Sequence, residues 1–258
     1  MDDPARFRAR VSEVVHDHRV VVDNAYTRWF AKGESTAAAV RHLTVQFSVF
    51  SHQFVEAQLR KVINAPSLEQ YRAGKEILMN ELGVAFSGPP DEEGIAAEGT
   101  VDGSRYVHPA AHFEWLVRFA RPLGLSFSDL GKRRHATPAT LFFCDELLRI
   151  YGAEDPSTAE GASYAVEHWA AAGFWKELIA GLRAFKSREC PGLPLGFWTW
   201  HDRVEDQHAA HTEDELAEAF AADGFDQERF LRGAHQMLDG VKAFWDGLEA
   251  HRRGTRAA

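Results

Sequence analysis

Cysteine is scarce in this chain, and its scarcity argues against a disulfide-stapled or cysteine-ligated fold. Cys144 and Cys190 are the only two cysteines among 258 residues, and they lie far apart in no spacing typical of a metal or redox site. A chain of this length can bury a core large enough to do without disulfides. The two thiols are therefore expected to be small buried groups in a reducing compartment.

Long apolar runs and an excess of positive charge are also missing. No stretch approaches the roughly 18 continuous apolar residues of a membrane span, and no basic segment followed by an apolar one opens the chain. The net charge of −9 argues against nucleic acid as the main partner. The sequence predicts a cytoplasmic protein that acts on a small molecule without nucleic acid or membrane partners, with a homodimer as an open alternative.

Helical periodicity dominates the chain, which is predicted to be all-α. Strand-like alternation is nearly absent, and glycine and proline fall between long amphipathic stretches. Ser35, Pro66-Ser67 and Thr137-Pro138 are expected to begin helices. The expected helices span roughly residues 5–31, 35–63, 67–84, 109–123, 137–152, 156–186, 193–210, 212–222 and 226–252.

One long irregular stretch, at about residues 86–107, interrupts the helical pattern. A loop of that length in a compact domain is usually functional or disordered, so a lid over a site and a mobile surface insertion both stay open. No period of roughly 20–50 residues repeats along the chain, which argues against a solenoid. We expect a single helical metal-binding domain over 1–258, with ligands projecting inward from different helices.

The pattern His-x3-Glu-x2-His near the C-terminal end carries most information about function. On a helix, His201, Glu205 and His208 fall on one face. Imidazole and carboxylate groups together suit iron, manganese or zinc. Large apolar neighbours indicate that this helix is mostly buried. Because unpaired buried charge is costly, the three side chains either bind metal or form a buried network of ion pairs.

Other helices offer further ligands. Glu167 lies among small residues that let helices approach closely, although a solvent-facing position is the alternative. Glu81 ends a helix just before the irregular stretch. After that stretch, either His108 or His112 can face inward, and His112 shares the apolar face of its helix with Leu116.

In this order, the motifs resemble those of the heme-oxygenase-like diiron oxidases and oxygenases. The similar text comprises Asn80-Glu81-Leu-Gly83, the Trp-Leu-x-Arg-Phe-Ala-x-x-Leu-Gly run after His112, Tyr164-Ala-Val-Glu167 and the final His-x3-Glu-x2-His. The resemblance covers the chain from about Trp29 to about Leu248. It implies a heme-oxygenase-like helical bundle with two Fe(II) ions, or manganese in their place. The implied ligands are Glu81, His112, Glu167, His201, Glu205 and His208.

This ligand set departs from the family pattern in two ways, and Glu56 is a candidate for an additional ligand. Glu205 stands where the family usually has Asp, and the gap between Glu81 and His112 is longer than usual. Family members that oxygenate nitrogen recruit an additional Glu, which Glu56 resembles because it interrupts an apolar stripe of the second long helix. The alternative is that Glu56 is exposed at the edge of the stripe.

The resemblance implies O2 activation and oxidation of a small amine or carboxylate. We expect N-oxygenation, desaturation or oxidative C–C cleavage of an amino-acid-like metabolite in natural-product biosynthesis, with O2 as co-substrate and an external electron donor as an option. Phe50, Trp198 and Trp200 are candidates for the pocket wall. Three alternatives are a fatty-acid oxidative decarboxylase, a metal-free thiaminase-like enzyme or cofactor-free oxidase of the same fold, and a non-enzymatic helical protein with buried ion pairs.

Overall fold

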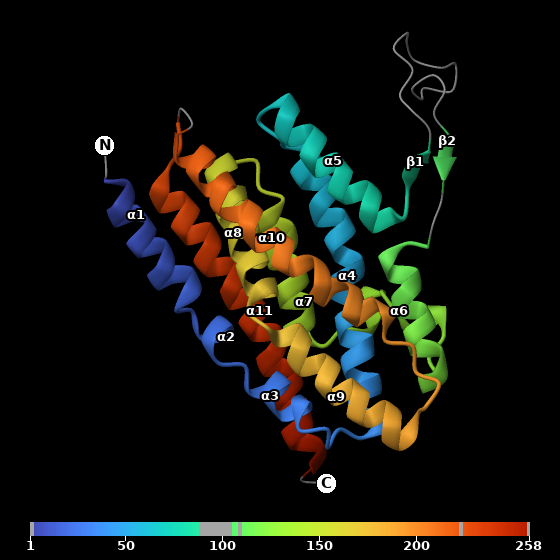
Figure 1. Ribbon diagram of the computed structural model, residues 1–258. Helices are drawn as coiled ribbons and strands as arrows, with labels where there is room; N and C mark the ends of the chain where they lie inside the picture. The colour runs from blue at the N-terminus through green and yellow to red at the C-terminus, as the bar shows by residue number, and fades with distance from the viewer. Residues whose placement is uncertain (1–2, 88–104, 108–109, 222–223, 257–258) are drawn as a thin grey trace.

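Eleven α-helices and one β-hairpin make up the described part of this computed structural model (Figure 1). The structure describes residues 3–87, 105–107, 110–221 and 224–256, without the side chains of 85–87, 105–107, 204–215, 218 and 255–256. The helices are α1 (Pro4–Val11), α2 (Arg19–Val22), α3 (Ala25–Ala31), α4 (Ala37–Ile63), α5 (Leu68–Leu82), α6 (His112–Ala120), α7 (Pro138–Glu146), α8 (Pro156–Ala171), α9 (Phe174–Glu189), α10 (Gly196–Ala221) and α11 (Gln227–Arg256). The expected all-α class is confirmed.

Several helices begin where capping residues predict. The side chains of Ser67, Thr137 and Asp155 accept hydrogen bonds from backbone N–H groups of the first turns of α5, α7 and α8. The start of α4 differs by one residue, because Thr36 rather than Ser35 is the cap. Ser35 is instead completely buried.

Three predicted helix boundaries are wrong. The expected helix over 5–31 is divided into α1, a π-helical turn at Ser12–His16, α2 and α3. The break between α2 and α3 occurs because the backbone adopts an extended conformation at Asp23. The expected helix over 156–186 ends before Gly173, whose φ of +92° is left-handed, and α9 follows. The expected break near residue 211 does not occur, because no glycine or proline interrupts α10.

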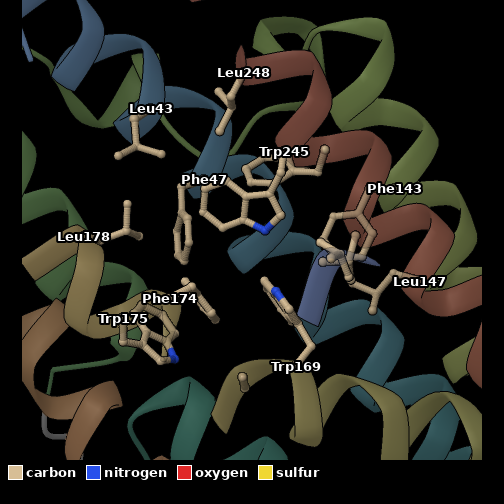
Figure 2. Packing of buried hydrophobic residues seen from close by; sticks show 14 of the residues in the cluster. Leu43, Phe47, Phe143, Leu147, Trp169, Phe174, Trp175, Leu178, Trp245 and Leu248 are labelled. Carbon is tan, nitrogen blue, oxygen red and sulfur yellow. The ribbon is translucent and has the colours of Figure 1, made fainter. Parts of the chain in front are cut away.

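Aromatic side chains from several helices pack together in the buried core of the bundle (Figure 2). Phe47 in α4 is 2% exposed, and its ring centroid lies 4.8 Å from Trp198 and 5.6 Å from Trp175. Phe174 stacks on Trp169 at 4.6 Å. These contacts join α4, α8, α9 and α10, two of which, α8 and α10, carry predicted ligands.

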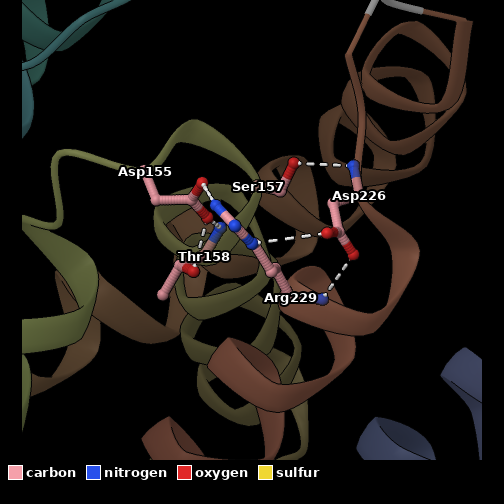
Figure 3. Close-up of polar contacts among 5 residues, drawn as sticks. All are labelled: Asp155, Ser157, Thr158, Asp226 and Arg229. Atoms are coloured by element: carbon pink, nitrogen blue, oxygen red, sulfur yellow. Dashed lines mark hydrogen bonds and ion pairs between the residues drawn. The ribbon is translucent and has the colours of Figure 1, made fainter.

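Helices α8 and α11 pack closely because glycine removes side chains at their crossing. A Cβ at Gly161 would lie 2.0 Å from the carbonyl oxygen of Phe230. Polar contacts fasten the start of this pair (Figure 3): Arg229 donates to Asp155 at 2.6 Å and pairs with Asp226 at 3.3 Å. The N-terminal end of α8 is thereby tied to the beginning of α11.

Two short paired strands lie at the two ends of the stretch over 86–107 that the sequence predicts to be irregular. Strands β1 (Ala85–Ser87) and β2 (Arg105–Val107) are antiparallel, with Ala85 opposite Val107. Residues 88–104 lie outside the described part of the chain, so the lid and the surface insertion both stay predictions. Helix α6, which follows β2 in the sequence, packs against α4, α5 and α10.

The expectation that both thiols are buried holds for Cys144 and not fully for Cys190. Cys144 is buried and Cys190 is half-buried, and burial raises the pKa of the Cys144 thiol to about 12, where it is unreactive at neutral pH. Among the residues that the structure describes, no helix has both the length and the apolarity to cross a membrane.

Candidate metal centre

Glu81 and His112 meet at the junction between α5 and α6. Glu81 lies in the last turn of α5, which Gly83 ends with a left-handed φ of +66°. His112 is the first residue of α6, on the far side of the hairpin. The Nδ1 atom of His112 lies 3.1 Å from Oε1 of Glu81, and the two side chains are 10% and 18% exposed.

The spacing between these two atoms suits both a hydrogen bond and a shared metal ion. A carboxylate only accepts, so in the metal-free pair Nδ1 of His112 carries the hydrogen. Two ligand atoms, each about 2.1 Å from one ion and at right angles, are about 3.0 Å apart. The observed distance in the pair is 3.1 Å. Among the described residues, His112 is therefore the histidine that the structure brings to Glu81. His108 lies outside the described residues, so the choice between the two histidines stays a prediction.

His201 lies beside this pair and is oriented by its own helix. Its ring centroid is 5.2 Å from that of His112. Its Nδ1 lies 2.7 Å from the carbonyl oxygen of Phe197 in the preceding turn of α10. Because a carbonyl only accepts, Nδ1 carries the hydrogen, and the neutral ring has its lone pair on Nε2. Metal-binding histidines typically donate their other N–H group to a carbonyl or carboxylate in this way.

The remaining predicted ligands are on α8 and α10. Glu167 is half-buried in α8, which packs against α10. Glu205 and His208 belong to the helical backbone of α10, but their side chains lie outside the described residues. The structure thus brings Glu81, His112 and His201 together and leaves the contribution of the other three a prediction.

Tryptophan rings surround the two histidines. The ring of Trp200 lies 4.4 Å from His112, and the ring of Trp175 is stacked 4.9 Å from His201. Trp115 packs edge-on against Trp200 at 5.6 Å. Sequence reasoning identified Trp200 as a wall residue but missed Trp115 and Trp175. Trp115 had a detectable signal, because it lies three residues after His112 in α6 and shares its side of the helix.

The other expected wall residues belong to the core. Trp198 is fully buried against Phe47, and Phe50 packs between Phe47, Phe143 and Phe244. Residues two apart on a helix lie about 200° apart around its axis, so Trp198 and Trp200 face different surroundings.

The expectation that Glu56 adds a ligand is not supported. Its side chain is 47% exposed and forms an ion pair with Arg60 at 3.0 Å, one turn along α4. The competing apolar face of α4, which includes Phe47 and Phe54, packs against the core instead. The edge position weighed as the alternative is the one observed.

A separate histidine–aspartate group lies between α2 and α11. Within the described residues, one group of three His, Cys, Asp or Glu side chains has all its ligand atoms within 4.8 Å: His18, His235 and Asp239. No three of the described predicted ligands reach that spacing. Yet Nδ1 of His18 accepts the N–H of Val20 as the cap of α2. The hydrogen of the neutral ring is then on Nε2, which faces Asp239 at 3.5 Å, so this group is a hydrogen-bonded network.

Comparisons with known proteins find similarity in structure alone. No protein-family model and no curated protein matches the sequence. A domain of unknown function with a heme oxygenase-like fold from Shewanella denitrificans OS217 superposes with a TM-score of 0.64 at 13% identity, covering 99% of this chain and 96% of that one. This chain has a heme-oxygenase-like fold.

Two further structures share this heme-oxygenase-like fold. A CADD-like protein of unknown function from Nostoc punctiforme PCC 73102 has a TM-score of 0.64 and 15% identity over 96% of this chain and 97% of its own. A TenA homolog from Pseudomonas syringae pv. tomato DC3000 has a TM-score of 0.66 and 10% identity over 95% and 93%. Identities this low establish the fold, and the function has to be argued from the site.

Proposed function

We propose that the protein is a non-heme diiron oxidoreductase that uses O2 to oxidise a small amino-acid-like metabolite. The observation that carries this proposal is the approach of Glu81 to His112 at 3.1 Å, with the His201 ring beside them. Three helices separated in sequence supply these groups at one mostly buried place. A carboxylate and two imidazoles in such a place are the donor types that iron prefers in helical bundles.

The described residues near this place offer the donor types that iron binds. Glu81 and Glu167 offer carboxylates, and His112 and His201 offer ring nitrogens. The carbonyl of Phe197 determines the tautomer of the neutral His201 ring. Glu205 and His208 would complete the implied set of six. Bound iron would supply the redox chemistry by which O2 is reduced and the substrate oxidised.

The chain's own part is to hold the ligands and to keep water out. The carbonyl of Phe197 fixes the ring of His201, so that its Nε2 points away from the α10 backbone. Trp115, Trp175 and Trp200 cover the histidine rings with apolar surface. A site walled in this way strengthens electrostatic contacts with the substrate and limits side reactions with water.

Metal content and O2 consumption test the proposal. The purified protein is loaded anaerobically with Fe(II), desalted, analysed by mass spectrometry of its metals, and then exposed to O2 in an electrode cell. We expect about two iron ions per chain and rapid O2 uptake. Absence of bound iron would favour a metal-free enzyme of the same fold. Loss of stability in His201→Ala, with bound iron unchanged from the wild type, would favour a structural ion-pair network.

A further inference from the structure

A cavity of about 340 Å³ lies between the C-terminal part of α4 and the helices α5, α8 and α10. Small residues keep it open: Ala73 and Gly74 line it from α5, and Ala159 from α8. A Cβ at Gly74 would lie 3.1 Å from Val62, so this glycine lets α5 approach α4. Ile77, Leu216 and Phe230 add larger apolar surface.

The cavity carries charge of both signs. Lys61 is the one lysine or arginine among its described lining residues, and Glu69 and Glu160 supply carboxylates. Lys61 is half-buried, and its ammonium donates to the hydroxyl of buried Ser163 at 2.6 Å and lies 4.9 Å from the centre of the Tyr151 ring. Glu160 is closer to the outside, where Gln70 donates to it at 3.0 Å.

Two helices lead directly from this cavity to the candidate metal centre. On α5, the lining residue Ile77 precedes Glu81 by four residues, and on α8 Ser163 precedes Glu167 by four. Residues four apart lie on the same face of a helix, with Cβ atoms about 5–6 Å apart. The cavity and both carboxylates therefore share the same faces of α5 and α8, one turn apart.

The position of Lys61 is held by the surrounding packing. The ring of Tyr151 is 1% exposed, and its hydroxyl donates to Gln58 at 2.7 Å. Gln58 in turn donates to the carbonyl of Gly74 at 3.0 Å. This chain of contacts ties Tyr151, which lies beside the ammonium of Lys61, to α4 and α5.

We propose that this cavity binds the substrate, an α-amino acid with an apolar side chain, and that Lys61 holds its carboxylate. This proposal rests on the proposed function for the reaction, but it makes its own claim about binding. An ammonium offers three donors, so Lys61 can contact a carboxylate while it contacts Ser163. Glu160 is the partner for the amino group, and Ile77, Leu216 and Phe230 receive the side chain. The volume accommodates a leucine- or phenylalanine-sized molecule, since ligand pockets start at about 300 Å³.

Calorimetric titration of the full-length protein with L-leucine and L-phenylalanine tests this assignment. We expect at least one of them to bind the wild type. Lys61→Met should weaken that binding about tenfold or more, because a charge-assisted hydrogen bond to the carboxylate is lost. Lys61→Arg should recover part of it. L-leucinamide, which lacks the carboxylate, and isocaproate, which lacks the amine, should each bind more weakly than L-leucine.

The matched control is Lys75→Met, which changes an exposed lysine of α5 that does not line the cavity. It should bind like the wild type. Binding of neither amino acid to the wild type, or equal binding by Lys61→Met, would overturn the proposal. Thermal melts of each variant identify unfolding, in which case the comparison of L-leucine with L-leucinamide on the wild type provides the second test.

Parallel measurement of iron separates this proposal from the proposed function. If Lys61→Met retains wild-type iron and loses the amino acid, both proposals are supported. If the wild type binds the amino acid but takes up no iron, the proposed function fails and the binding site stands. If the wild type takes up iron but binds neither amino acid, the binding site fails alone.

Discussion

Glu81 and His112 are 31 residues apart in the sequence, and their side chains meet at 3.1 Å. The last turn of α5 presents one and the first turn of α6 presents the other, with the β1–β2 hairpin between them. Because neither helix alone contains the pair, its geometry depends on how α5 and α6 pack. Changes to either residue therefore test the candidate metal centre directly.

Substitution of this pair should reduce iron binding. Glu81→Gln keeps the size of the side chain and removes its charge, and His112→Gln removes the ring nitrogen. Each should lower the affinity for Fe(II) by at least the roughly 10–100-fold that loss of a supporting residue typically costs at a metal site. Competition with a coloured chelator measures this affinity.

The control for iron binding is His235→Gln, which lies in the separate network with His18 and Asp239. Iron affinity should stay at the wild-type value in this variant. Loss of iron in His235→Gln, with retention in the Glu81 and His112 variants, would move the metal site to the α2–α11 network.

Introducing a methyl group at Gly161 should destabilise the fold. Its Cβ would lie 2.0 Å from the carbonyl oxygen of Phe230, so α8 and α11 would have to separate. We expect Gly161→Ala to lower the free energy of unfolding by about 1–3 kcal/mol despite the better helix propensity of alanine. Urea denaturation measures the change. In Gly254→Ala, where nothing lies within 4 Å, the same substitution should cause no loss.

Removal of the Phe47 ring should cost much more than removal of an exposed phenylalanine. Phe47 is 2% exposed and contacts Trp175 and Trp198 at the centre of the bundle. Phe47→Ala should lower the free energy of unfolding by about 3–5 kcal/mol. Phe127 is 59% exposed, and Phe127→Ala should cost less than about 1 kcal/mol. Equal losses in the two urea titrations would contradict the packing described above.

Stability should fall in mild acid because of His42. Burial, with a smaller contribution from neighbouring His251, lowers the pKa of His42 to about 4 from 6.5. Between these values the unfolded chain binds the proton and the folded protein does not. The free energy of unfolding therefore decreases as the pH drops from about 6.5 to 4, and this contribution is constant above that window. Its slope is at most about 1.4 kcal/mol per pH unit, and less because His42 is partly exposed.

His42→Phe should remove this contribution. Its Nε2 is buried without a hydrogen-bond partner, and its ring is stacked on His251 at 3.6 Å, so an aromatic ring without the titrating nitrogen suits the position. Urea titrations at neutral and mildly acidic pH should find a flatter dependence in the variant than in the wild type. An unchanged slope in His42→Phe would rule out His42 as its source.

Much of the helical pattern followed from local signals. Ser67, Thr137 and Asp155 start helices because a side-chain oxygen next to a helical sequence satisfies exposed N–H groups whatever the rest of the chain does. The break at Gly173 was missed, because glycine also occurs inside helices and adopts a left-handed conformation only where the following helix must turn back on the core.

The sequence by itself determined the helical class and the face that His201 shares with its neighbours in α10, since helix periodicity is a local property of the chain. Only the tertiary structure decided that His112 contacts Glu81 and that Glu56 is exposed. It also decided that Lys61 lines a cavity one turn from two predicted ligands. Distances between residues on different helices depend on the packing of side chains from the whole core, and no spacing along the chain encodes them.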